Sequence, residues 1–159
     1  MDKAITTIML TVAAIVAIVA VANAVLPSVD RTSGALISAS GVVQDRISSQ
    51  ISLINATGVN GNPDASAWVK NVGSSTIAPL NRVDVFFGPS GNFQRIPYGG
   101  AGCVAPCWEY SFETGTTTWV PTATLLITIH TGTALATGTT YYVQVVTPNG
   151  ITDSKTFTV

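Results

Sequence analysis

The sequence predicts an α+β protein in which a long N-terminal hydrophobic α-helix is followed by an immunoglobulin-like antiparallel β-sandwich. Three observations predict this fold. Residues 4–26 contain no charged side chain, apolar residues recur at helical spacing over residues 29–54, and short alternating runs follow residue 64. We expect three parts: an N-terminal hydrophobic helix and amphipathic stalk over 1–57, a linker over 58–64 and a β-sandwich outer domain over 65–159.

The composition points to a protein that hides much of its surface. Charged residues make up 9% of the chain and hydrophobic residues 47%, whereas soluble domains usually carry about 25% charged residues. The net charge of −1 provides no basic field to hold nucleic acid. A chain with so few charges suits burial in a bilayer or among neighbouring subunits.

The segment from Ala4 to Leu26 is long enough to cross a bilayer, which takes about 20 apolar residues. A secretory signal peptide is the competing interpretation, and Ala22 to Ala24 resembles a cleavage site. Such a peptide has a basic leader and an apolar core of about 7 to 15 residues. Here the leader is Lys3 beside Asp2, and the apolar run is longer. We therefore expect the segment to be retained.

This segment is apolar on every side, so lipid or other helices must surround it. Alanines recur along it and allow close helix approach. We expect membrane insertion first and packing among copies of the same helix later. The residues expected to carry this assembly are Ile5, Ile8, Met9, Val12, Ile15, Val16 and Val19.

After Pro27 one apolar stripe indicates an amphipathic stalk. Its members are Val29, Leu36, Val43, Ile47, Ile51 and Ile54. We expect the helix to end near Asn55 to Gly58, with Gly58 as the C-terminal stop. A continuous helix of about 54 residues would be roughly 80 Å long, which suits the core of a filament. The alternative is a membrane anchor with a short coiled-coil linker.

Eight short runs predict the strands of the sandwich. They are 66–72, 82–87, 93–97, 108–112, 117–120, 125–130, 139–147 and 151–159. Asn149-Gly150 between the last two is a strong hairpin signal. We expect Trp68, Phe86 and Trp119 to be large core residues.

Cys103 and Cys107 lie four residues apart and predict a small-loop disulfide in an oxidising exterior. The alternative is a pair of free thiols. A zinc site would need two further ligands, and the chain has a single histidine, His130. We expect neither a metal nor a cofactor.

Residues for catalysis are not grouped in the sequence. Asp84 and Asp153 stand singly, and His130 ends a strand with no nucleophile patterned beside it. We therefore expect no enzyme activity. Asn55-Ala56-Thr57 is a formal acceptor for N-glycosylation, and modification of Asn55 stays a prediction.

Several runs resemble the globular domain of archaellins. They are Trp68 to Ile77 (WVKNVGSSTI), Val83 to Phe87 (VDVFF), Leu135 to Tyr141 and Val145 to Ile151. Together with the helix, they make the chain similar to the archaellin and archaellum pilin-like family. This archaeal flagellin superfamily includes the G- and F-type accessory subunits.

The resemblance implies a structural subunit of an extracellular, type IV pilin-like filament for motility or adhesion. Its helices would form a homo-polymeric core after transient membrane insertion, with the sandwiches as the outer sheath. The implied partners are the filament assembly machinery and a prepilin-type peptidase. Two departures stand out: no basic leader ending in glycine precedes Met1, and Ile5 replaces the glutamate of bacterial type IV pilins.

Two other functions compete with this hypothesis. In the first, the helix stays in the membrane and the sandwich binds the surface layer as a stator or bearing of the archaellum. In the second, the sandwich is adhesive, with Tyr98, Trp108 and Tyr110 as an exposed aromatic patch near the cysteine loop.

Overall fold

The computed structural model describes residues 2–113 and 115–159. Within the long helix it describes side chains at 3–24, 40, 41, 43, 44 and 46–48. The chain divides into two compact units, residues 1–43 and 44–159.

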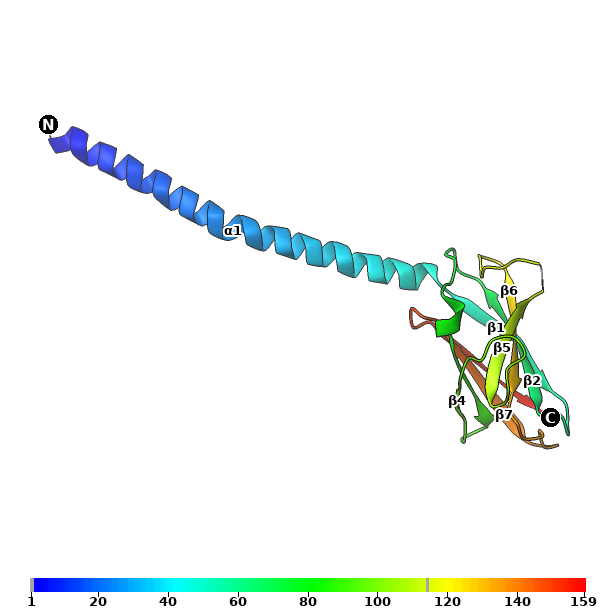
Figure 1. Ribbon diagram of the computed structural model, residues 1–159. Helices are drawn as coiled ribbons and strands as arrows, with labels where there is room; N and C mark the ends of the chain where they lie inside the picture. Colours follow the sequence, from blue (N-terminus) through cyan, green and yellow to red (C-terminus); the bar gives the residue numbers. More distant parts are fainter. Residues whose placement is uncertain (1, 114) are drawn as a thin grey trace. The chain divides into compact units, whose positions relative to one another are not determined.

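Helix α1 spans Asp2–Ser48, 47 residues in one uninterrupted element (Figure 1). The predicted continuation of the helix past Pro27 is confirmed. Of the predicted stalk stripe, Val43 and Ile47 are exposed, while the side chains of Val29 and Leu36 lie outside the described residues.

The predicted end of the helix near Asn55 to Gly58 is wrong. The helix ends at Ser48, and strand β1 occupies Ile51–Gly58. Ile51 and Leu53 are buried in the sandwich core. Their spacing of two places both side chains on one face of a strand, and burial there outweighs the weak helical preference of this β-branched run.

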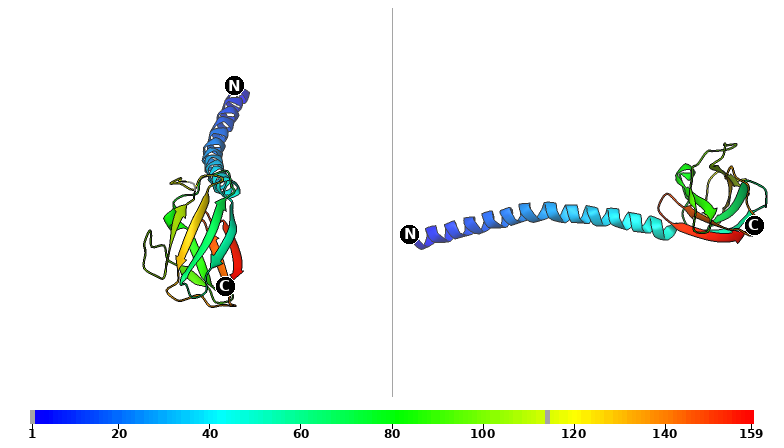
Figure 2. Two further views of the ribbon diagram at one scale, coloured as in Figure 1. Left: turned by 90° about the vertical axis from the view of Figure 1, so that its right-hand side faces the viewer. Right: turned by 90° about the horizontal axis from the view of Figure 1, so that it is seen from below.

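The second unit contains two four-stranded antiparallel sheets that pack face to face (Figure 2). The first sheet has the order β1-β2-β6-β5, with β2 at Asp64–Asn71, β6 at Thr124–His130 and β5 at Cys107–Phe112. The second has the order β4-β3-β7-β8, with strands at Gln94–Ile96, Asp84–Pro89, Thr140–Val146 and Thr152–Thr158. A short 3-10 helix, Leu80–Arg82, precedes β3.

The core lies between the sheets because alternate residues point inward, as period-two strands require. Trp108, Trp119, Leu125 and Ile127 are among its fully buried side chains. Trp119 was predicted to lie in the core, and it does.

Trp68 and Phe86 were expected in the core, and this expectation is wrong. Both lie on outer faces and are only half-buried, because their inward-pointing neighbours Val69 and Phe87 take the core positions. Residues 117–120 are also not a strand. There Trp119 forms a single isolated bridge with Ile77.

One side of the sandwich is closed by two charged side chains. Strands β1 and β8 lie beside each other, and a bulge occurs in β1 between Leu53 and Asn55. At this bulge the Leu53 N–H donates to Asp153 Oδ2 at 2.6 Å, and the Lys155 ammonium donates to the Ile54 carbonyl. Two side chains therefore form hydrogen bonds with backbone groups of β1 that an open edge would leave unpaired.

Candidate functional site

The first unit exposes an apolar surface along the described part of α1. The seven side chains predicted to carry assembly are exposed by 52% to 69%. The span Lys3–Ala24 has a mean hydropathy of 2.6, and none of it is buried within the chain. Its 22 residues correspond to about 33 Å of helix, close to the roughly 30 Å of a bilayer's hydrocarbon core. The span is therefore long enough to cross a membrane.

The junction between the helix and the sandwich is held by a loop after β2. The last helical carbonyl, that of Ser48, accepts hydrogen bonds from the N–H groups of Ser74 at 2.8 Å and Ser75 at 3.2 Å. The Gln50 carbonyl accepts from Val72 and Gly73 at 2.9 and 3.0 Å. Carbonyls at a helix end lack intrahelical partners, and Ser74 and Ser75 satisfy that of Ser48.

Asn71 organises this loop from inside the protein. Its side chain is fully buried, and its amide nitrogen donates to the carbonyls of Ser75 at 2.8 Å and Trp119 at 2.9 Å. Its amide oxygen accepts from the Gly73 N–H at 3.0 Å. Gly73 leaves no room for a side chain, since an added Cβ would lie 2.3 Å from the Ser48 carbonyl oxygen.

The Lys70 to Ser75 run therefore has a physical role in the junction. Sequence reasoning noticed this run only as a sign of resemblance. Its Asn-x-Gly-Ser spacing marks a buried amide followed by a close backbone approach, and that signal could have located the junction.

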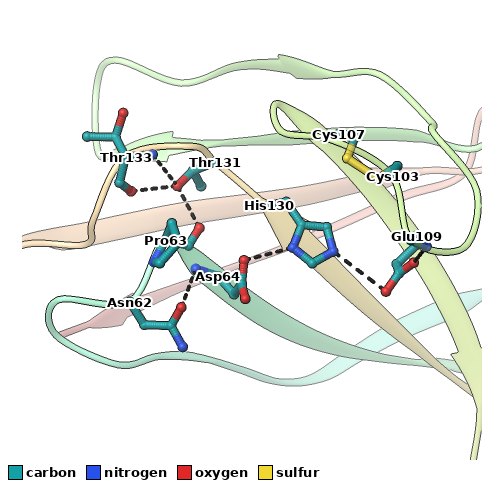
Figure 3. A network of polar contacts seen from close by, with 10 residues as sticks. Asn62, Pro63, Asp64, Cys103, Cys107, Glu109, His130, Thr131 and Thr133 are labelled. Carbon is teal, nitrogen blue, oxygen red and sulfur yellow. Dashed lines mark hydrogen bonds and ion pairs between the residues drawn. A yellow bond between two sulfur atoms is a disulfide. The ribbon is translucent and has the colours of Figure 1, made fainter.

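A second polar cluster joins three strands of the first sheet near the cysteine loop (Figure 3). His130 Nδ1 lies 2.7 Å from Asp64 Oδ1, and His130 Nε2 lies 3.6 Å from Glu109 Oε1. Glu109 Oε2 accepts from the Gly102 N–H at 2.5 Å. The hydrogen bond to Asp64 raises the pKa of His130, and Glu109 adds to this effect although burial opposes it.

This cluster links strands β2, β5 and β6 through their side chains. Asp64 and Glu109 bind opposite nitrogens of one imidazole ring, so their oxygens do not converge on a common point. Among the described residues, no group of three His, Cys, Asp or Glu side chains could hold a metal ion.

A hollow of about 290 Å³ lies between strands β3 and β4 and the loop at 131–135. Phe87, Ile96 and Tyr141 are among its lining residues, and none of the described residues that line it is a carboxylate, histidine or lysine. It therefore offers no acid–base pair.

The cysteine loop contains a disulfide between Cys103 and Cys107. The nearby aromatic residues do not form the predicted exposed patch. Trp108 is fully buried, Tyr98 is 37% exposed and Tyr110 is half-buried. The expectation of three exposed rings is wrong for Trp108, whose ring points into the core between the sheets.

Asn55 is exposed on β1, opposite Trp68 on β2. Its side chain is thus accessible. Its glycosylation stays a prediction.

The chain is similar to proteins of the archaellum. The family model for archaeal-type flagellin matches residues 2–157. The archaellum periplasmic stator protein FlaG from Sulfolobus acidocaldarius is 32% identical, with 69% of this chain and 99% of that chain covered and a TM-score of 0.60. The stator complex of FlaF and FlaG from the same organism is also 32% identical, with coverages of 68% and 88% and a TM-score of 0.59.

A filament protein has the same fold at lower identity. The archaeal flagellum of Methanospirillum hungatei strain JF1 is 16% identical, with 94% of this chain and 90% of that chain covered and a TM-score of 0.68. No curated protein sequence matches the chain.

An apolar N-terminal helix followed by a two-sheet sandwich defines a structural protein of the archaellin fold. The chain belongs to the archaeal-type flagellin family. This is a family of structural archaellum proteins, and it is not an enzyme family.

Proposed function

We propose that this protein is a membrane-anchored accessory component of the archaellum, of the stator kind. The span Lys3–Ala24 lies in the membrane, and the sandwich stands outside it and binds surface-layer proteins. The observation that carries the proposal is the identity of the chain to two stator structures, 32% in each over about two thirds of its length, against 16% for the filament protein. The apolar span supports it, because its length matches a bilayer.

A filament subunit is the second candidate function. The match to the filament protein covers 94% of this chain and so includes the helix. In this role the helices would pack against copies of themselves after leaving the membrane. Van der Waals packing of small and β-branched side chains would hold such a core, because lipid already solvates apolar surface.

Cell fractionation separates the two functions. Shearing releases filaments, while anchored proteins stay with the membranes. For a stator we expect the full chain in the membrane fraction and, by immunogold labelling, at the base of the archaellum. Label along the sheared filaments would contradict the stator and favour the filament subunit.

A charge within the helix tests the anchoring itself. Val12→Asp or Ile15→Asp places a carboxylate in the middle of the apolar span, which costs roughly 3 kcal/mol in a bilayer. We expect these variants to leave the membrane fraction while the sandwich stays folded. Val59→Asp, at an exposed valine of the sandwich, is the matched control and should remain in the membrane.

A further inference from the structure

The outer edge of strand β5 differs from the closed side of the sandwich. β5 is the last strand of its sheet. On the opposite side, the side chains of Asp153 and Lys155 form hydrogen bonds with the backbone of β1. Among the residues that the structure describes, the outer side of β5 has a backbone partner at Trp108 alone. Its N–H donates to the Pro97 carbonyl at 3.0 Å, and its carbonyl accepts from the Gly99 N–H at 3.1 Å.

The backbone groups of Tyr110 and Phe112 point to the same outer edge. In an antiparallel pair, alternate residues direct their N–H and C=O groups away from the neighbouring strand. Trp108 does so in its pairing with β6, and Tyr110 and Phe112 follow at spacings of two. Among the described residues, neither has a backbone partner outside the β5–β6 ladder.

The pairing stops after Trp108 because the chain turns away at Gly99 and Gly100. An added Cβ on Gly99 would lie 2.4 Å from Cys103 Cβ, and Gly100 has a φ of +75°. The disulfide loop that follows thus lies beside the free edge without covering Tyr110 and Phe112 with a strand. Its tip, Val104, is 89% exposed.

Apolar side chains accompany this edge. The rings of Tyr98 and Tyr110 stack with centroids 5.9 Å apart, and the Phe112 ring meets Tyr110 edge-on, also at 5.9 Å. We call the residues Tyr98, Val104, Tyr110 and Phe112 the β5 edge surface. Unpaired backbone beside half-buried rings fits an extended polypeptide with apolar side chains at every second position.

The acidic residues on the other face of β5 indicate which side chains should alternate with the apolar ones in a bound polypeptide. Glu109 and Glu113 flank the free segment. Glu109 in β5 contacts His130 of β6, and Glu113 in the turn after β5 accepts a hydrogen bond from the outward-facing Trp68 indole, so both carboxylates lie on the outer side of the sheet. Pairing with a second copy of β5, with Tyr110 opposite Phe112, would set Glu109 opposite Glu113 twice. Like charges directly opposite each other destabilise a strand pair, so this register of self-pairing is disfavoured, and the two carboxylates favour a strand with basic residues there.

We propose that the β5 edge surface binds an extended segment of a different protein, in which apolar residues alternate with lysine or arginine. The segment adds a strand to the first sheet through the backbone of Tyr110 and Phe112. Its apolar side chains contact the rings, and its basic side chains pair with Glu109 and Glu113. This site is independent of the choice between stator and filament.

Amide hydrogen exchange on the full chain in zwitterionic detergent micelles tests the free edge. We expect the Tyr110 amide to exchange fast while those of Glu109 and Ser111, which face β6, are protected. Equal protection of Tyr110 and Ser111 in the protein alone would overturn the proposal. Protection of Tyr110 that rises with protein concentration would also overturn it, because a second copy would then be the occupant.

A capped seven-residue peptide of alternating valine and lysine tests the partner's chemistry by NMR titration. We expect it to shift and protect the Tyr110 and Phe112 amides. A matched valine–glutamate peptide should bind roughly tenfold more weakly, because it forfeits two exposed ion pairs. Equal binding of the two peptides, or shifts confined to other strands, would overturn the proposal.

Variants of the acidic residues give the matched protein control. Glu109→Gln combined with Glu113→Gln retains the side-chain acceptors and should weaken binding of the lysine peptide roughly tenfold. Asp84→Asn, at a carboxylate of the other sheet paired with Arg95, should leave it unchanged. An equal loss in both variants would show general charge attraction and would also count against the edge site.

Discussion

At the scale of single residues, Asn71 organises the junction between the helix and the sandwich. Its buried amide serves three backbone groups, the carbonyls of Ser75 and Trp119 and the N–H of Gly73. We expect Asn71→Ala to lower the free energy of unfolding by about 3 kcal/mol, since it removes three hydrogen bonds worth about 1 kcal/mol each. Urea denaturation measures this loss. Asn62→Ala, which removes one exposed bond to the Asp64 N–H, should cost about 1 kcal/mol or less.

His130 makes the stability of the sandwich depend on pH. Its pKa in the folded protein is raised by Asp64 and then by Glu109, so the folded state binds the proton more tightly than the unfolded state. The stabilisation is full below the ordinary histidine pKa of about 6.5 and is lost as the pH rises through the higher folded value. We expect His130→Gln to shift the urea midpoint more at pH 5 than at pH 9. A shift of equal size at both pH values would contradict this account.

At the scale of elements, the turn from helix to strand depends on Gly73. A side chain there would meet the Ser48 carbonyl oxygen and the Gln50 nitrogen, both of them backbone atoms that cannot move independently. We therefore expect Gly73→Ala to destabilise the sandwich by about 1 to 3 kcal/mol through backbone displacement. Gly61→Ser is a weaker comparison, because only its φ of +79° opposes the change and no atom lies within 4 Å. Thermal unfolding of both variants would show the difference, and an unchanged Gly73→Ala midpoint would contradict it.

The elements also show what the sequence could and could not predict. The apolar helix and seven of the eight strands were predictable, because each follows from the period of its apolar residues. Strand β1 was missed for two reasons. Val43, Ile47, Ile51 and Ile54 fit a helical stripe, and the bulge next to Leu53 breaks the alternation that would have indicated a strand. Long-range pairing with β2 decides this segment, and a local pattern does not contain that information.

The junction and the β5 edge could be predicted only in part. Asn71 and Gly73 stand in a recognisable run, but Ser48 lies 25 residues before Gly73 and Trp119 lies 48 residues after Asn71. Likewise, strand order determines that β5 is an edge. The sequence of Cys107 to Phe112 reads equally well as a central strand.

At the scale of the whole molecule, the two units have separate sources of stability. The sandwich core is built from residues of 51–145, and α1 contributes no buried apolar side chain to it among the described residues. The helix in turn has an apolar span with nothing buried, so its stability in the cell has to come from lipid or from other subunits.

This separation predicts that residues 44–159 fold without the apolar span. The FlaG structure is consistent with this, because 69% of the present chain covers 99% of it. We expect the fragment to be soluble and to unfold cooperatively, with the fluorescence of Trp108 and Trp119 blue-shifted by burial and red-shifting at the transition. The full chain should instead partition into lipid vesicles, because the span 3–24 exposes apolar side chains throughout. A fragment without a cooperative transition would show that the helix stabilises the sandwich, and the independence of the two units would then be wrong.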